Sequence, residues 1–155
     1  MDENREFLRH TLATLAYRAT RALDGAPDEF AEFSGCGRTP GEILAHMGDL
    51  FDWALSIASG QQRWKNSSPL PLAEEKQRFF AALTAFDTYL SGPQPVHAEL
   101  ERLFQGPVAD AINHVGQLAM MRRLAGSKIK GENFFVAEIR AGQTGASQPE
   151  PVKTF

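Results

Sequence analysis

The sequence predicts an all-α protein, a bundle of four long helices in a single domain. Apolar residues recur at intervals of three or four in four separate stretches, as they do on the buried face of a helix. Capping residues, glycines and prolines bound these stretches. The chain has 155 residues, of which 43% are hydrophobic, and this suits one domain with one core. The helical stretches are residues 3–23, 39–59, 72–90 and 106–124.

The first two helices have the clearest boundary signals. The first follows Asp2, a capping residue, and ends before Gly25. The second opens with the sequence Thr39-Pro40-Gly41-Glu42, which has a capping Thr, a Pro at the first helical position and a Glu three residues after the cap. Gly60 then provides the C-terminal stop.

The later helices are separated by long connections. Ser91-Gly92-Pro93 ends the third helix, a short helical segment is expected at residues 97–104, and the fourth helix begins near Pro107. Antiparallel neighbours in a bundle are usually joined by about two to eight residues. The longer connections therefore favour a bundle with a crossover, or loops that cover a site. They are residues 24–38, 60–71 and 91–105.

The domain is predicted to cover residues 1–140. Within it, residues 133–136 form either a short strand or a docked segment. Residues 141–155 are polar and contain glycines and prolines, so we expect a flexible C-terminal tail. The sequence has no internal repeat and no sign of a second domain.

Composition and charge exclude several classes of protein. Sixteen basic and nineteen acidic residues give a net charge of −3, which disfavours nucleic-acid binding. No apolar stretch reaches the length of about 18 residues that spans a membrane. The opening sequence MDENREF is unlike a secretory signal, and Cys36 has no partner for an internal disulfide. We expect a cytoplasmic protein with neither membrane nor nucleic-acid partners.

Three residues form a candidate metal site. His46 shares a helix face with apolar residues of the second helix, and His114 does the same in the fourth. Asp110 precedes His114 by four residues, so the two side chains lie one turn apart. An ionised aspartate directed into a core needs compensation, and a divalent cation would provide it. Two imidazoles and one carboxylate are a recurrent ligand set for catalytic zinc and for non-haem iron.

A structural interpretation of the same residues stays open. A single histidine on an apolar face is more often a hydrogen-bonded core residue than a ligand. Asp110 is also close enough to a helix start to interact favourably with the helix dipole. Spacing by itself does not separate these alternatives.

Other residues are weaker candidates. Glu42 precedes His46 by one turn and is a candidate acceptor beside a metal ligand, or a general base toward a substrate, although its capping role already explains it. Gln117 follows His114 by nearly one turn and is a candidate to orient that ligand. Asp49 is expected on a solvated face. Cys36 lies in a glycine-flanked loop without an identifiable base.

Two helices resemble those of the DinB-like family of bacterial four-helix-bundle metalloproteins. They are TPGEILAHMGDLFDWAL and DAINHVGQLAMMRRLAG. The sequence from His114 to Leu118 matches the H-x-G-Q-L pattern that ends the family's metal motif, and His46 corresponds to the histidine of the family's second helix. Asp110 stands where the family usually has His. The segment GSKIKGENFF also resembles a family subgroup, and the resemblance covers roughly residues 1–140.

The resemblance implies an up-down-down-up four-helix bundle with an extended C-terminal segment and a metal at one open end. The ligands would be His46, Asp110 and His114, and the metal a single divalent transition ion: zinc, nickel or iron. Some family members are S-transferases or isomerases that use a small thiol, and family analogy allows a homodimer. With Asp110 the site is one charge less positive than a three-histidine site, which favours oxygen-preferring metals.

Two functions from different classes follow. The first is a metal-dependent enzyme of the transferase, isomerase or hydrolase type, acting on a small molecule or thiol, in which the cation is a Lewis acid or activates water or a thiol. Its catalytic residues beyond the ligands are not identifiable. The alternative is a non-catalytic helical module that binds a small ligand or serves a stress response. The aspartate at position 110 and the lack of an evident nucleophile or acid–base pair favour this alternative.

Overall fold

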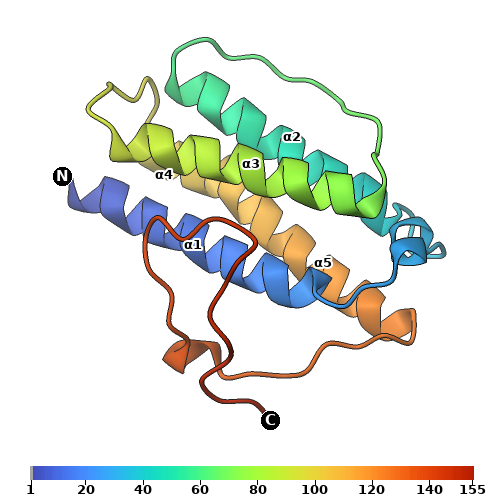
Figure 1. The fold of residues 1–155 in the computed structure, drawn as a ribbon. Coiled ribbons are helices and arrows are strands. Elements are labelled where there is room, and N and C mark those ends of the chain that lie inside the picture. Colours follow the sequence, from blue (N-terminus) through green and yellow to red (C-terminus); the bar gives the residue numbers. More distant parts are fainter. Residues whose placement is uncertain (1) are drawn as a thin grey trace.

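The computed structural model describes residues 2–155, and the fold is all-α. Four long helices pack side by side, shorter helical turns join them, and residues 2–155 contain no β-strand beyond one isolated bridge (Figure 1). The prediction of an all-α fold is therefore confirmed. The long helices are α1 (Glu3–Leu23), α2 (Pro40–Ala58), α3 (Leu72–Ser91) and α5 (Ala109–Leu124). The shorter elements are η1 (Asp28–Glu32), α4 (Leu100–Leu103), η2 (Phe104–Val108) and η3 (Phe134–Val136).

The capping residues act as the sequence predicts. The Asp2 side chain accepts a hydrogen bond from the backbone N–H of Asn4 at 3.1 Å. At the start of α2, the Thr39 hydroxyl accepts from the Glu42 N–H at 3.2 Å, and the Glu42 carboxylate accepts from the Thr39 N–H at 3.3 Å. Both halves of the capping box are thus formed, and they fix where α2 begins.

The start of α5 differs from the prediction. The short helix begins at Leu100 rather than at residue 97, and it runs into α5 through the π-helical turn η2, which contains Pro107. Proline lacks the N–H that a regular α-helical turn needs, so the wider turn carries the chain past it. Asp110 therefore follows residues that are already helical and does not face the free amides of a helix end. This removes much of the dipole explanation for that residue.

The core lies between the four long helices. Aromatic side chains from α2 and α3 form its centre, with ring centroids 6.0 Å apart for Phe51 and Phe79 and 6.2 Å apart for Phe51 and Phe86. Leucines and alanines of α1 and α5 complete it. These buried faces fix how α2 and α5 are rotated toward each other, which matters for the site described below.

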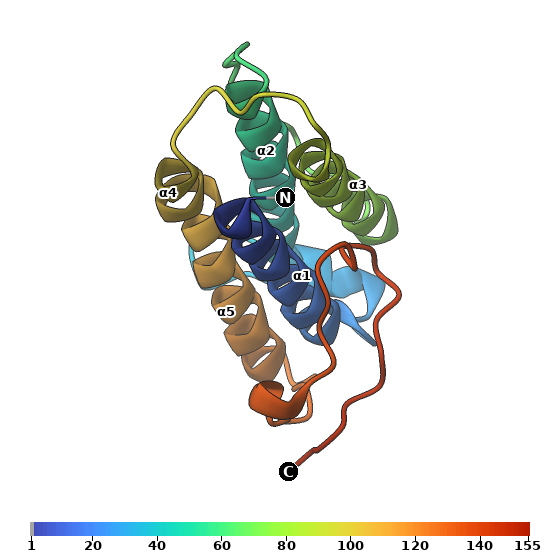
Figure 2. The same cartoon turned by 90° about the vertical axis from the view of Figure 1, so that its left-hand side faces the viewer.

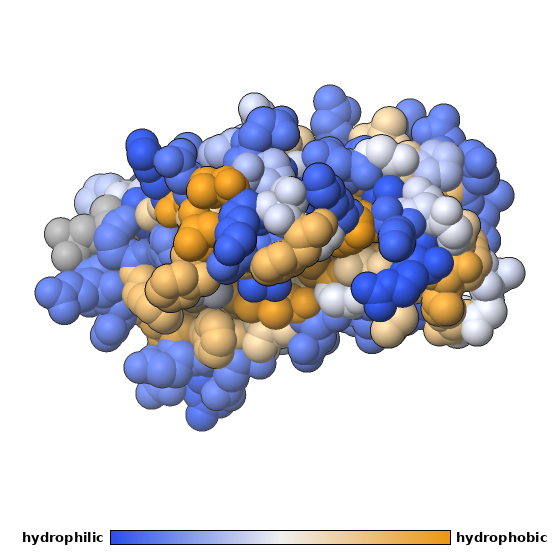
Figure 3. Space-filling model, turned by 90° about the horizontal axis from the view of Figure 1, so that it is seen from below, coloured by the Kyte–Doolittle hydropathy of each residue, from blue (hydrophilic) through white to orange (hydrophobic). Residues whose placement is uncertain are grey.

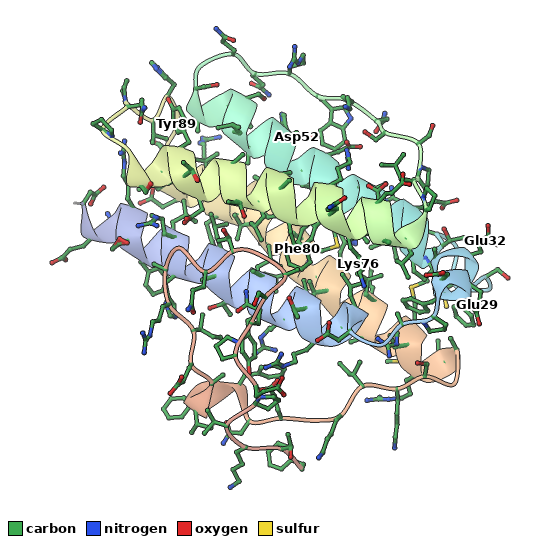
Figure 4. The ribbon with its side chains drawn as sticks, in the orientation of Figure 1. Glu29, Glu32, Asp52, Lys76, Phe80 and Tyr89 are labelled. Atoms are coloured by element: carbon green, nitrogen blue, oxygen red, sulfur yellow. The ribbon has the colours of Figure 1, made fainter. Side chains whose placement is uncertain are left out.

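The connection between α2 and α3 runs back along the outside of the bundle (Figure 1). Asp49 of α2 holds it, because its buried carboxylate accepts from the N–H and the hydroxyl of Ser67, each at 2.7 Å. The Arg78 guanidinium of α3 also donates to Asp49. The expectation that Asp49 lies on a solvated face is therefore wrong. Asp52, labelled in Figure 4, is the exposed acid of this helix face.

The chain that follows α5, residues 127–155, is called the C-terminal segment, and it lies against α1 in both ribbon views (Figures 1 and 2). The buried Glu132 carboxylate accepts from the Tyr17 hydroxyl at 2.6 Å and from Arg21 Nε at 2.8 Å. Farther along, the Thr144 hydroxyl is 2.9 Å from that of Thr84 on α3.

The composition of residues 141–155 predicts a loose tail, whereas the structure gives this segment partners on the bundle. Residues 133–136, for which a strand or a docked segment was expected, form η3. Seen from below, the face that carries this segment mixes apolar and hydrophilic side chains (Figure 3). None of the helices within residues 2–155 has the length and apolar character needed to span a bilayer.

Candidate metal centre

The three predicted ligands lie together. His46 projects from the first half of α2, and Asp110 and His114 project from the first two turns of α5. One ligand atom from each lies within 4.8 Å of the other two. The convergence follows from the packing of α2 on α5, which turns the two histidine-bearing faces toward each other, and from the four-residue spacing within α5.

The Asp110 carboxylate sits between the two imidazoles. Its Oδ2 is 3.1 Å from His46 Nε2, and its Oδ1 is 3.4 Å from His114 Nε2. The two imidazole rings meet edge to face, with centroids 5.0 Å apart. Zinc bonds of about 2.0–2.2 Å at tetrahedral angles would place neighbouring ligand atoms about 3.4 Å apart. The cluster thus has roughly the dimensions of such a site.

Gln117 determines which nitrogen of His114 carries the proton. His114 Nδ1 donates to the amide oxygen of Gln117 at 2.7 Å, since that oxygen can only accept. In neutral His114 the other nitrogen, Nε2, then presents a lone pair toward the Asp110 carboxylate. Two acceptors that face each other repel unless a proton or a metal ion lies between them. The donor set therefore fits a cation, and Gln117 contacts the site as the sequence predicts.

The Asp110 side chain is more exposed than the sequence predicts. Its side chain is 45% exposed, against 22% for His46 and 12% for His114. The expectation of an aspartate directed into the core is wrong, because Asp110 projects from the side of α5 that borders the hollow, whereas its neighbour Ala111 is buried in the core. The case for a metal rests instead on the convergence of the three side chains and on the acceptor pair.

The cluster opens into a hollow of about 800 Å³. Cys36 and Arg38 line it from the η1–α2 loop, and Asn113, Gln117 and Met120 line it from α5. The cluster is thus accessible to a small molecule. Cys36 and Arg38 were not predicted to lie near the ligands, because the loop that carries them has no periodic pattern that would reveal its course.

Trp64 is a second neighbour that the sequence did not reveal. It belongs to the α2–α3 connection, and its ring meets that of His46 edge to face with centroids 5.8 Å apart. Trp53 of α2 supports it in turn at 5.7 Å. The indole of Trp64 covers one side of His46 and restricts the orientation of that ring.

Glu42 is not part of this cluster. Its carboxylate is engaged in the capping box, and it lines a different hollow together with Thr39 and Pro71. One helical turn separates Glu42 from His46, but the exposed start of α2 directs the glutamate to another side of the molecule. Its proposed contact with the ligands is therefore not found.

Comparisons of this chain with protein-family models, with curated proteins and with solved structures found no match. The resemblance to the DinB-like family therefore stays a prediction, based on the sequence patterns around His46 and His114.

Proposed function

We propose that this protein is a metal-dependent enzyme in which His46, Asp110 and His114 hold one divalent transition metal. The observation that carries the proposal is the acceptor pair formed by Asp110 and His114 Nε2, 3.4 Å apart, with His114 Nδ1 committed to Gln117. Three protein ligands leave coordination positions for a substrate, as in catalytic rather than structural zinc sites. Zinc, nickel and iron all accept this ligand set.

The metal would supply a Lewis acid, or lower the pKa of a water or thiol, in a transferase, isomerase or hydrolase reaction. The chain's own residues have distinct tasks. Gln117 keeps the proton on His114 Nδ1, Trp64 limits access of water to one side of His46, and Arg38 lines the hollow where it can pair with an anionic group of a substrate.

We further propose that the chain is a member of the DinB-like family with its up-down-down-up helix order. The H-x-G-Q-L pattern beginning at His114 and the long connection along the outside of the bundle between α2 and α3 support this assignment. Family members that use small thiols make a thiol the first substrate class to test.

Metal content is the decisive measurement. We expect about one transition-metal ion per chain by elemental analysis of protein purified without chelators, or on titration of metal-free protein followed by calorimetry. Replacing any one ligand by Ala should weaken metal binding by more than about a hundredfold, because loss of a ligand exceeds the 10–100-fold effect of losing a residue that orients one. His10→Ala, which removes an exposed histidine of α1, is the matched control. Absence of metal after both experiments would refute the proposal.

The alternative is a module that binds an organic ligand without a metal. The 3.1 Å contact between His46 Nε2 and Asp110 favours it, because a proton on that nitrogen satisfies both groups without a cation. A thermal-shift screen separates the two functions, since whatever binds the folded state raises its stability. Stabilisation by organic compounds and by no divalent metal would support the module.

A further inference from the structure

Two hollows lie on either side of the exposed face of α5, the first at the metal cluster and the second beside it. The second hollow has a volume of about 420 Å³ and is lined by α5, by residues 128–132 and Phe134 of the segment that follows it, and by Phe155. Gly116 and Met120 line both hollows. On the helix these two residues form the exposed crest between the side that faces α2 and the side that faces the C-terminal segment. One extended molecule could therefore occupy both hollows by crossing this crest.

Gly116 has no side chain that would stand between the two hollows, and neither its packing nor its backbone conformation requires a glycine. A Cβ at this position would meet no atom within 4 Å, and φ is not in the left-handed region. Glycine is a poor residue for the middle of a helix, so neither packing nor backbone geometry accounts for it. A side chain at position 116 would extend into the open space outside α5, between the two hollows that Gly116 lines.

The second hollow is positively charged. Arg123, Lys128 and Lys130 line it, and none of the ion pairs found within residues 2–155 involves them. The acidic side chain in its lining, Glu132, is already paired with Arg21 and is only 2% exposed.

Arg122 does not belong to this group of cations. It is buried and donates to the backbone carbonyl oxygens of Ala22, Asp24 and Ser127. The basic residues that follow one another in the sequence thus divide into one structural arginine and three cations that are free to bind an anion.

We propose that the ligand of this protein is an elongated molecule with a phosphate or carboxylate at the end remote from the metal. One end reaches His46, Asp110 and His114, the middle crosses α5 at Gly116, and the anionic end pairs with Arg123, Lys128 and Lys130. From His114 to Arg123 the helix rises about 13–14 Å, which sets the scale of the molecule. The proposal rests on the metal site proposed above.

Binding of synthetic probes to the zinc-loaded protein tests the proposal. The probes are alkyl hydroxamates that chelate zinc at one end and carry a carboxylate at the other, in a series of increasing chain length. Their methyl esters are the neutral controls, and acetohydroxamate probes the metal end alone. At the best length we expect the acid to bind about tenfold more tightly than its ester, the order expected when two or three exposed ion pairs add.

Removal of the three cations should abolish that preference. In Arg123→Gln/Lys128→Gln/Lys130→Gln, we expect acid and ester to bind equally, with unchanged affinity for acetohydroxamate. Lys65→Gln/Lys76→Gln/Arg102→Gln removes the same charge elsewhere and should keep the preference. Equal binding of acid and ester to the wild type at every length, or loss of the preference in both triple variants, would overturn the proposal. Failure of zinc and acetohydroxamate to bind would instead refute the metal site itself.

Gly116→Ala provides an independent test. We expect a higher Tm, because alanine favours the helix and its methyl group has room, together with unchanged binding of zinc and acetohydroxamate. Binding of the best long probe should weaken at least several-fold. Unchanged binding of that probe would contradict the crossing. A change in mass by sedimentation, with no change in probe binding, would mean that Gly116 lies against a second copy of the chain, and the proposal would fail.

Discussion

Two aspartates of this protein, Asp49 and Asp110, have opposite surroundings. The Asp49 side chain is 3% exposed, and hydrogen-bond donors surround it: two from Ser67 and the guanidinium of Arg78. The Asp110 side chain is 45% exposed, and it faces two imidazole nitrogens, one of which presents a lone pair. The Asp49 carboxylate is saturated by donors and belongs to the framework, whereas the Asp110 carboxylate faces another acceptor and is the one that we propose to bind a cation.

The comparison predicts a large loss of stability for Asp49→Ala. The largely buried Arg78 would lose one of its two buried carboxylate partners and keep Glu75, and the α2–α3 connection would lose its anchor at Ser67. We expect the free energy of unfolding, measured by urea denaturation, to fall by about 3 kcal/mol. Asp52→Ala, which removes an exposed acid three residues away, should change it by less than about 0.5 kcal/mol. Equal effects of the two variants would show that Asp49 is not a framework residue.

Asp110→Ala should show the opposite pattern to Asp49→Ala, with little loss of stability and a large loss of metal binding. Asp110→Ala is expected to leave the free energy of unfolding of the metal-free protein nearly unchanged, because its side chain is half exposed and its ion-pair partners within residues 2–155 are the two imidazoles. The same variant should lose metal binding. A variant at position 110 that destabilised the metal-free fold as strongly as Asp49→Ala would place Asp110 in the framework as well.

The sequence predicts the burial of these two aspartates the wrong way round, with Asp49 exposed and Asp110 directed into the core, and the reason is physical. Periodicity reports which helix face is apolar, but it does not report what a distant segment brings to the other side. Ser67 lies eighteen residues beyond Asp49 along the chain, in a connection without periodic structure. Only the tertiary fold shows that this connection passes over α2 and buries the carboxylate.

Other features were predictable because their causes are local. The capping box at Thr39 fixes the start of α2, and the four-residue spacing fixes Asp110 beside His114. Trp64 and the C-terminal segment were not predictable, since their positions depend on long-range contacts such as that of Glu132 with Tyr17. Composition described the polar character of residues 141–155 correctly, but the partners that hold them belong to the bundle.

Gln117 offers a smaller and more specific test of the candidate metal site. Gln117→Ala removes the acceptor that holds the proton on His114 Nδ1, and we expect metal affinity to fall about tenfold. Gln117→Glu retains an acceptor and should restore most of the affinity. Asn113→Ala changes a residue that lines the same hollow and should bind metal like the wild type. Calorimetric titrations of the three variants that gave equal affinities would show that Gln117 does not orient His114.

The last test concerns Tyr17, which joins α1 to the C-terminal segment through Glu132. Burial, together with the hydrogen bond to Glu132, raises the pKa of the Tyr17 phenol above its ordinary value of 10.0. The protonated phenol therefore stabilises the fold fully below about pH 10, and this contribution is lost as the pH rises through the higher pKa of the folded state. Tyr17→Phe should reduce the free energy of unfolding by about 1–2 kcal/mol at pH 8. That difference from the wild type should narrow at pH 11, because the wild type alone loses the contribution of the phenol.

Tyr89→Phe removes a phenol that donates to the carbonyl oxygen of Pro95 at the exposed side of α3 (Figure 4), and it should cost less than Tyr17→Phe at pH 8. A difference between wild type and Tyr17→Phe that stayed constant from pH 8 to pH 11 would contradict the coupling. In that case the attachment of the C-terminal segment would depend on its contacts with Arg21 and Thr84 rather than on the buried phenol.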